Sequence, residues 1–277
     1  MKTLVLLTAV VALAVAIPLD VESANNLKDF LASNEVSADQ KQNLASYNYA
    51  VDLSAPATQS IFACLRQSGY ATAFLRVYKP DGRGSVDQDG IASVKYAYSA
   101  NMGVEVYHTP AVQSNKPGYQ QFDESYTALR NAGINVRTIW LQVTSPVNWG
   151  SNQQYNIELI SAFLNRGKTY NVNVGVYTNW YDWSQITGSW SGWTSAELVS
   201  LWYWNANGIG SSAKSSEDFS DFRAFGGWTQ PAVKQFSLQA NLCGVQFNRN
   251  IYPAGTYALS RSSAVADNEI LVGNLIV

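Results

Sequence analysis

The sequence is poor in metal-binding side chains and in charge. It has one histidine and two cysteines in 277 residues, and charged residues make up 14% of the chain. With no second histidine, and no cysteine or carboxylate at ligand spacing, we expect no metal site. A formal net charge of −2 and a pI near 5.4 argue against a nucleic-acid surface or an anionic-membrane surface.

Other motifs are also lacking. There is no G-x-S-x-G string and no phosphate-binding glycine loop, so we predict no cofactor. No N-x-S/T sequon occurs, and we find no linker, repeat or low-complexity tract. Beyond the N-terminus no apolar run approaches membrane-spanning length, because EILVGNLIV is interrupted by Gly273 and Asn274. The 47% apolar composition suits one large core.

The N-terminus has the features of a secretory signal peptide over residues 1–16. Lys2 precedes an unbroken apolar stretch, and Ala14 and Ala16 form an A-x-A cleavage pattern. A membrane anchor is the less favoured alternative, because no basic stop-transfer flank follows. Residues 17–46 read as a helical pro-segment or N-terminal arm, and 47–277 as the main domain. We therefore expect a secreted protein without a membrane anchor.

Export makes a disulfide between Cys64 and Cys243 the favoured state of the two cysteines. Cys64 lies just after the first predicted strand, and Cys243 opens a late one. The bond would join the two ends of a closed barrel. Two buried free thiols are the alternative.

Alternating strand and helix patterns fill the first part of the main domain. Strands are predicted at 48–54, 72–78, 103–109, 136–144 and 172–178. Helices are predicted at 58–68, 88–101, 118–132 and 152–167, the first three ending near Gly69, Gly103 and Gly133. Regular βα spacing of this kind favours a parallel sheet that closes into a barrel.

The last strands depart from that rhythm. Strands are predicted at 200–206, 232–238 and 243–248. Only a few residues separate the last two, and a parallel crossover needs a dozen or more, so these two should pair antiparallel. The predicted fold is a modified TIM-like (β/α) barrel, with its first strands parallel and its last strands antiparallel.

Three predicted strands end in a polar rim. Asp52 with Ser54, Glu105 with Tyr107, and Gln142 with Thr144 share a face near the C-terminal end of their strands. The opposite face is apolar and should pack under helices. Barrel folds present their sites at this end.

The segments YAVDLS, EVYHTP, IWLQVTSP, VGVYTNWYDW, LWYWNANG, VKQFS and GVQFN follow one another in order over about residues 47–252. In this ordered set the chain resembles the family-25 glycoside hydrolases, in their divergent protist- and nematode-type lysozyme-like branch. The resemblance implies cleavage of the muramyl β-1,4-glycosidic bond of bacterial peptidoglycan. The D-x-x-D-x-D-x-E string of family-18 chitinases is absent.

The resemblance also implies which site residues are retained. Asp52 matches the family's Asp on the first strand, whereas Gln142 and Thr144 occupy its Asp-x-Glu pair and Gln246 matches a late Asp. The general acid is therefore missing, because neither Gln142 nor Thr144 can protonate a leaving group at neutral pH.

Glu105 is a candidate substitute acid that would pair with Asp52 inside the barrel. A buried Glu105 neutralised by Arg76 is an equal alternative. His108 reads as a packed residue or a substrate contact rather than a catalytic base. Tyr107, Tyr177, Trp202 and Trp204 are candidates for stacking on sugar rings, in a chain with nine Trp and sixteen Tyr. We read the segment 180–193 as a loop that walls a groove.

Three functions remain open. The leading one is a secreted, monomeric lysozyme-like enzyme that acts on bacterial peptidoglycan in antibacterial defence or in digestion of bacteria. The second is a glycan-binding immune effector that has lost hydrolysis. The third is a structural or signalling protein that keeps the barrel as a scaffold.

Overall fold

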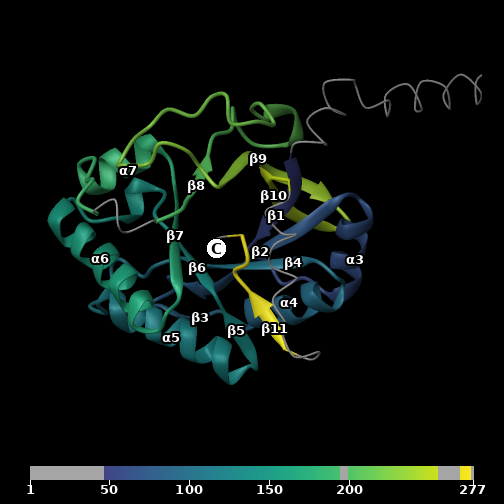
Figure 1. Cartoon of the computed structure of the whole chain (residues 1–277), viewed down its shortest axis with the longest axis horizontal. Helices are drawn as coiled ribbons and strands as arrows, with labels where there is room; N and C mark the ends of the chain where they lie inside the picture. Colours follow the sequence, from purple (N-terminus) through teal and green to yellow (C-terminus); the bar gives the residue numbers. More distant parts are fainter. Residues whose placement is uncertain (1–46, 194–198, 255–268, 276–277) are drawn as a thin grey trace, which may run out of the picture. The chain divides into compact units, whose positions relative to one another are not determined.

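The computed structural model describes residues 47–193, 199–254 and 269–275 (Figure 1). The main sheet has the order β1-β10-β9-β8-β7-β6-β4-β2-β3, and an added pairing of β1 with β2 closes eight of these strands into a barrel. The eight are β1 (Tyr47–Leu53), β2 (Tyr70–Lys79), β4 (Gly103–His108), β6 (Thr138–Gln142), β7 (Asn173–Thr178), β8 (Leu201–Trp204), β9 (Val233–Leu242) and β10 (Val245–Pro253).

Strand direction in the barrel confirms the predicted fold. Neighbouring strands are parallel from β1 through β2, β4, β6, β7 and β8 to β9. Only β10 runs antiparallel to both of its neighbours, β9 and β1. The short β3 (Ser85–Val86) pairs with β2, and β5 (Ile134–Val136) pairs with β11 (Ile270–Val272) in a separate sheet.

The α-helices of the described residues lie around the outside of this ring of strands (Figure 1). They are α3 (Gln59–Gln67), α4 (Gln88–Ser99), α5 (Gly118–Asn131), α6 (Gln153–Thr169) and α7 (Trp180–Thr187), with 3-10 turns η1 (Pro146–Asn148) and η2 (Ser211–Ala213). Gly69 and Gly133 follow α3 and α5 at φ values of 94° and 78°, as predicted. After α4 the left-handed position falls on Asn101 instead of Gly103, because Asn tolerates this conformation. No helix in these described stretches is long and apolar enough to cross a membrane.

Two predicted segments need correction. The strand expected at 136–144 is divided into β5 and β6, and Thr144 follows the end of β6. The loop expected at 180–193 begins with the helix α7. The side chain of Asn179 caps this helix by accepting a hydrogen bond from the backbone N of Asp182 at 2.8 Å. Trp183 then turns inward and is 1% exposed, which ties α7 to the core.

The barrel interior is packed with aromatic rings. Phe74 lies between Trp140 and Trp202, with ring centroids 6.0 and 4.4 Å away. Gly175 on the neighbouring β7 makes room for this packing, because a Cβ there would lie 2.3 Å from the ring of Trp140. A second apolar cluster, of mainly aliphatic residues, fills the space between barrel and helices. The barrel is therefore a filled core, open to ligands only near its ends.

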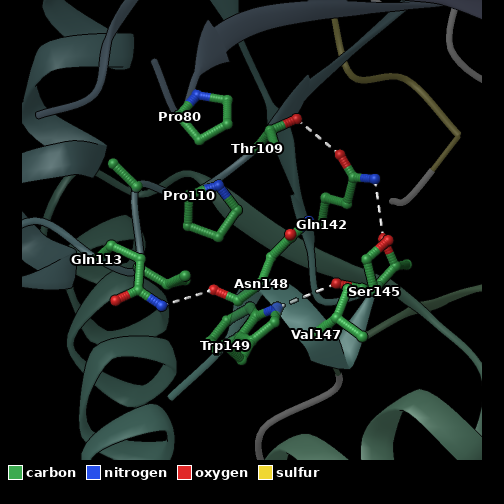
Figure 2. Close-up of a pocket in the computed structure, with 12 residues that line it drawn as sticks. Pro80, Thr109, Pro110, Gln113, Gln142, Ser145, Val147, Asn148 and Trp149 are labelled. Carbon is green, nitrogen blue, oxygen red and sulfur yellow. Dashed lines mark hydrogen bonds between the residues drawn. The ribbon is translucent and has the colours of Figure 1, made fainter. Parts of the chain in front are cut away.

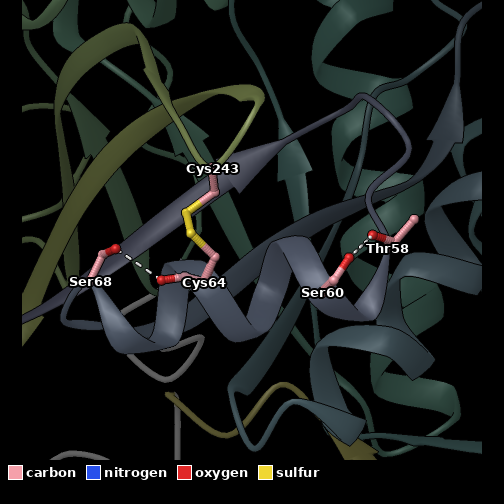
Figure 3. Close-up of a disulfide and its surroundings, with 5 residues drawn as sticks. All are labelled: Thr58, Ser60, Cys64, Ser68 and Cys243. Carbon is pink, nitrogen blue, oxygen red and sulfur yellow. Dashed lines mark hydrogen bonds between the residues drawn. A yellow bond between two sulfur atoms is a disulfide. The ribbon is translucent and has the colours of Figure 1, made fainter.

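A disulfide joins Cys64 in α3 to Cys243, as predicted (Figure 3). The two Cα atoms are 5.9 Å apart. Cys243 lies in the turn between β9 and β10, at a φ of 56°, and not at the start of a strand. The bond thus fixes the β9–β10 hairpin to the helix that follows β1.

Candidate functional site at the carboxyl end of the barrel

Asp52 projects from the end of β1 into the barrel and is 3% exposed. Three amide side chains bind its carboxylate. Gln235 Nε2 and Asn250 Nδ2 donate to Oδ1 at 2.7 and 2.8 Å, and Asn248 Nδ2 donates to Oδ2 at 2.8 Å. Burial raises the pKa of Asp52, while these three hydrogen bonds oppose the rise. Within the described part of the chain the hydrogen-bond donors to this carboxylate are three neutral amides, which hold it in one orientation.

Two aromatic side chains orient the amides in turn. The Tyr177 hydroxyl donates to Gln235 Oε1 at 2.9 Å, and Trp202 Nε1 donates to Asn250 Oδ1 at 2.8 Å. The rings of Tyr177 and Trp202 stack with centroids 4.1 Å apart. A closed ring of contacts therefore runs from Asp52 through both amides and both aromatics. Because Trp202 is fully buried and Tyr177 is 7% exposed, they support Asp52 and are not open platforms for a sugar.

The sequence did not reveal the amides around Asp52. It predicted that Gln246, as the match to a late Asp of the family, belongs to the site. Gln246 is exposed and pairs with Asn241 in the β9–β10 hairpin. The hairpin is longer than predicted, so the residues that reach Asp52 come later in β10. The period-two spacing of Asn248 and Asn250 was the available signal.

Gln142 and Thr144 line a cleft of about 460 Å³ at the ends of β4 and β6 (Figure 2). Thr109 Oγ1 donates to Gln142 Oε1 at 2.6 Å, and Gln142 Nε2 donates to Thr144 Oγ1 at 2.9 Å. The floor and walls are neutral throughout: Pro80, Thr109, Pro110, Ala111, Val112, Gln113, Gln142, Thr144, Ser145, Val147, Asn148 and Trp149. Gln142 is paired in register with Tyr177 on β7, which links this cleft to the Asp52 ring.

Asp182 is a second buried carboxylate at this end of the barrel, and the sequence did not single it out. Its Oδ2 accepts from Trp204 Nε1 at 2.9 Å, and the backbone N–H of Ser145 also donates to it. Burial raises the pKa of Asp182. Through these contacts it joins α7, the end of β8 and the cleft wall. Trp204, predicted to stack on sugar, is partly exposed.

Glu105 and Tyr107 face the barrel interior, as strand parity predicted, and Tyr107 hydrogen-bonds with Ser54 and lies near Asp52. Tyr107 is 5% exposed and packs edge-on against Trp202 at 5.8 Å. Glu105 is fully buried, with Trp140 Nε1 donating to Oε2 at 2.8 Å and the Leu275 backbone N to Oε1 at 3.0 Å.

The structure does not bring Glu105 and Asp52 into one cleft. Trp140, the partner of Glu105, packs against Trp202 at 6.0 Å, and Trp202 bonds the amide beside Asp52. An aromatic layer thus lies between the two carboxyl groups. The alternative in which Arg76 neutralises Glu105 is wrong, because Arg76 instead pairs with Asp87 at 2.9 Å.

His108 is a packed residue. It is fully buried, stacks on Tyr78 at 4.2 Å, and hydrogen-bonds through Nδ1 with Ser125 Oγ at 2.7 Å. Burial lowers its pKa to about 3. It therefore stays neutral and has no access to a substrate.

Comparison with known proteins identifies the chain. A family model described as lysozyme-like protein 1 matches residues 43–236. The chain belongs to this lysozyme-like family. Lysozyme-like protein 7 of Caenorhabditis elegans is 40% identical over 263 residues, 95% of this chain and 91% of the relative. A probable GH family 25 lysozyme of Dictyostelium discoideum is 32% identical over 204 residues, 73% of this chain and 90% of the relative.

Solved structures agree on the fold. A bacterial lysozyme from Streptomyces coelicolor superposes with a TM-score of 0.59 at 20% identity, covering 76% of this chain and 94% of that one. A GH25 lysozyme from Aspergillus fumigatus gives 0.58 at 14% identity, covering 79% and 100%. The chain is thus a lysozyme-like member of the GH25 glycoside hydrolase fold, and the resemblance noted in its sequence is confirmed.

Glu105 gives this lysozyme-like barrel a testable pH dependence. Burial raises the pKa of Glu105 from 4.5 to about 7, so the folded state binds a proton that the unfolded state has released. Stability is then highest below about pH 4.5 and falls by about 3 kcal/mol as the pH rises to about 7. We expect thermal melts at pH 4.5, 6 and 8 to show falling midpoints. Glu105→Gln should flatten this trend, and an unchanged trend in that variant would assign it to other groups.

Proposed function

We propose that this lysozyme-like protein is secreted and acts on bacterial peptidoglycan, at the muramyl β-1,4-glycosidic bond, in antibacterial defence or in digestion of bacteria. The observation that carries the proposal is the oriented Asp52 carboxylate, linked through Tyr177 to a sugar-sized neutral cleft at the barrel mouth. Its relatives with lysozyme names support the same substrate class.

Asp52 can supply one half of the chemistry. An anionic carboxylate beside the reacting sugar stabilises the positive charge of an oxocarbenium-like transition state. The other half, a proton delivered to the leaving oxygen, has no carboxyl group among the residues that line the cleft. We therefore expect any hydrolysis to be slow, since loss of a general acid costs about two to four orders of magnitude in rate.

A second candidate function is binding of peptidoglycan without hydrolysis. The hydrogen-bonded chain of Thr109, Gln142 and Thr144 favours it, because neutral hydroxyl and amide groups recognise sugar hydroxyls without protonating anything. Both candidate functions, hydrolysis and binding alone, use the same cleft at the carboxyl end of the barrel.

The deciding experiment uses purified protein without residues 1–16. Clearing of a bacterial cell-wall suspension measures hydrolysis, and a pull-down on insoluble peptidoglycan measures binding. Clearing with binding supports the enzyme, and binding alone supports the glycan-binding protein. Absence of both would refute the proposed substrate.

Export is tested separately. Because Ala14 and Ala16 provide the small residues that signal peptidase requires, we expect protein recovered from the medium of secreting cells to begin at Ile17 or within a few residues of it. N-terminal sequencing gives the answer directly. Exported protein that still carries Met1 would contradict the cleavage.

A further inference from the structure

Trp180 is exceptional among the nine tryptophans of the chain. All nine lie in described stretches, and Trp180 is the exposed one, at 58%, while the others are buried or half-buried. Tyr181 beside it is 52% exposed, and the two rings meet edge-on with centroids 6.0 Å apart. Leaving two large aromatic rings in water forgoes the stabilisation that burial would give. Adjacent exposed aromatics are a feature of binding surfaces.

The pair opens a helix whose first turn borders the cleft at the barrel mouth. Both residues open α7, which follows β7 and therefore begins at the carboxyl end of the barrel. The next residue, Asp182, accepts a hydrogen bond from the backbone N–H of Ser145, and Ser145 lines the cleft. Helix α7 also contacts η1, whose Val147 lines the cleft and is 91% exposed.

The rest of α7 is anchored, so the backbone that carries the pair is held in place before any ligand arrives. Trp183 packs against Trp193 at 4.9 Å and Trp228 at 5.1 Å. The side chain of Asn179 caps the helix. A fixed aromatic surface binds with little loss of conformational entropy.

The chemistry of the pair fits a sugar. Pyranose rings present apolar C–H faces that pack on indole and phenol rings, and the hydroxyl of Tyr181 and the indole N–H of Trp180 can bond to sugar hydroxyls. We propose that Trp180 and Tyr181 form an outer subsite for a polymeric glycan strand that continues beyond the cleft. This inference rests on the proposed function and adds to it a preference for polymer over short fragments.

The test compares Trp180→Ala, Tyr181→Ala and the double variant with the unmodified protein. The matched control is Tyr96→Ala, which removes a ring that is 44% exposed near the C-terminal end of α4, away from the mouth. Affinity is measured for insoluble peptidoglycan by depletion and for a soluble tetrasaccharide fragment of the same wall by titration calorimetry. Circular dichroism confirms that each variant is folded.

We expect the double variant to lose about tenfold in affinity for the polymer, or about 1.4 kcal/mol, because two ring contacts with the sugar are removed. Its affinity for the fragment should stay within about twofold, and Tyr96→Ala should change neither. Unchanged polymer binding in the double variant would overturn the outer subsite and leave the proposed function standing. Equal losses for polymer and fragment would also overturn it, because the pair would then belong to the cleft. An unmodified protein that binds neither ligand refutes both proposals.

Discussion

Replacing Gln142 by Asp together with Thr144 by Glu is expected to raise cell-wall lysis by at least about a hundredfold, because a carboxyl group able to donate a proton returns to the mouth. The geometry suits the exchange. Thr109, which now donates to Gln142 at 2.6 Å, can donate to a carboxylate, and the cleft of about 460 Å³ has room for a glutamate. Turbidity clearing of bacterial walls is the measurement.

Two controls sharpen this result. Gln142→Asn with Thr144→Gln alters size without adding an acid, so lysis should remain at the original level. Adding Asp52→Asn to the double variant Gln142→Asp with Thr144→Glu should remove most of the gain in lysis. A correctly folded double variant with no gain would mean that the cleft is not aligned with the family's catalytic centre.

Asp52→Asn is expected to lower any lysis by at least about a hundredfold, because it removes the carboxylate proposed to stabilise the positive charge of the reacting sugar. The fold should tolerate the change. The new side-chain oxygen can still accept from Gln235 and Asn250, and one hydrogen bond, the one that Asn248 Nδ2 donates, is lost because the new amide nitrogen cannot accept it. Peptidoglycan pull-down should be retained, since binding through neutral groups and aromatic rings does not need this charge.

Glu105→Gln is the matched control for Asp52→Asn. The sequence predicted that Asp52 and Glu105 act as a pair, but Glu105 is fully buried beside Trp140 and Leu275. We expect lysis to persist in this variant at a pH where it is folded. A hundredfold loss of lysis with unchanged stability would reinstate the pair.

The barrel could be predicted from sequence because its strands and helices have different periods. Apolar and polar residues alternate with a period of two in the strands, glycines mark the ends of helices, and the short gap between the last two strands required an antiparallel pair. The helix α7 was missed because its regularly spaced tryptophans suggested a loop, while the decisive signal was the cap at Asn179. Local capping chemistry overrode the wider pattern.

The site was harder to predict because strand parity gives the face of a residue but not its depth. Tyr107 and Trp202 do face inward, yet they lie in the packed interior. Depth depends on how neighbouring strands are staggered around the barrel, which a single strand does not encode. The partners of Asp52 come from β9 and β10, at the far end of the chain, so only the folded structure could join them.

Closure of the barrel by β10 has a consequence for biosynthesis. The edge of β1 that pairs with β10 stays unpaired until the ribosome has synthesised nearly the whole domain. Cys64 likewise has no disulfide partner until Cys243, 179 residues further along, has been synthesised. At about 5 to 20 residues per second, this interval lasts roughly 10 to 40 s on the ribosome. The nascent chain must therefore keep an open strand edge and a reactive thiol out of intermolecular contacts for that time. Oxidation of the pair can begin only after this interval, when Cys243 has been made.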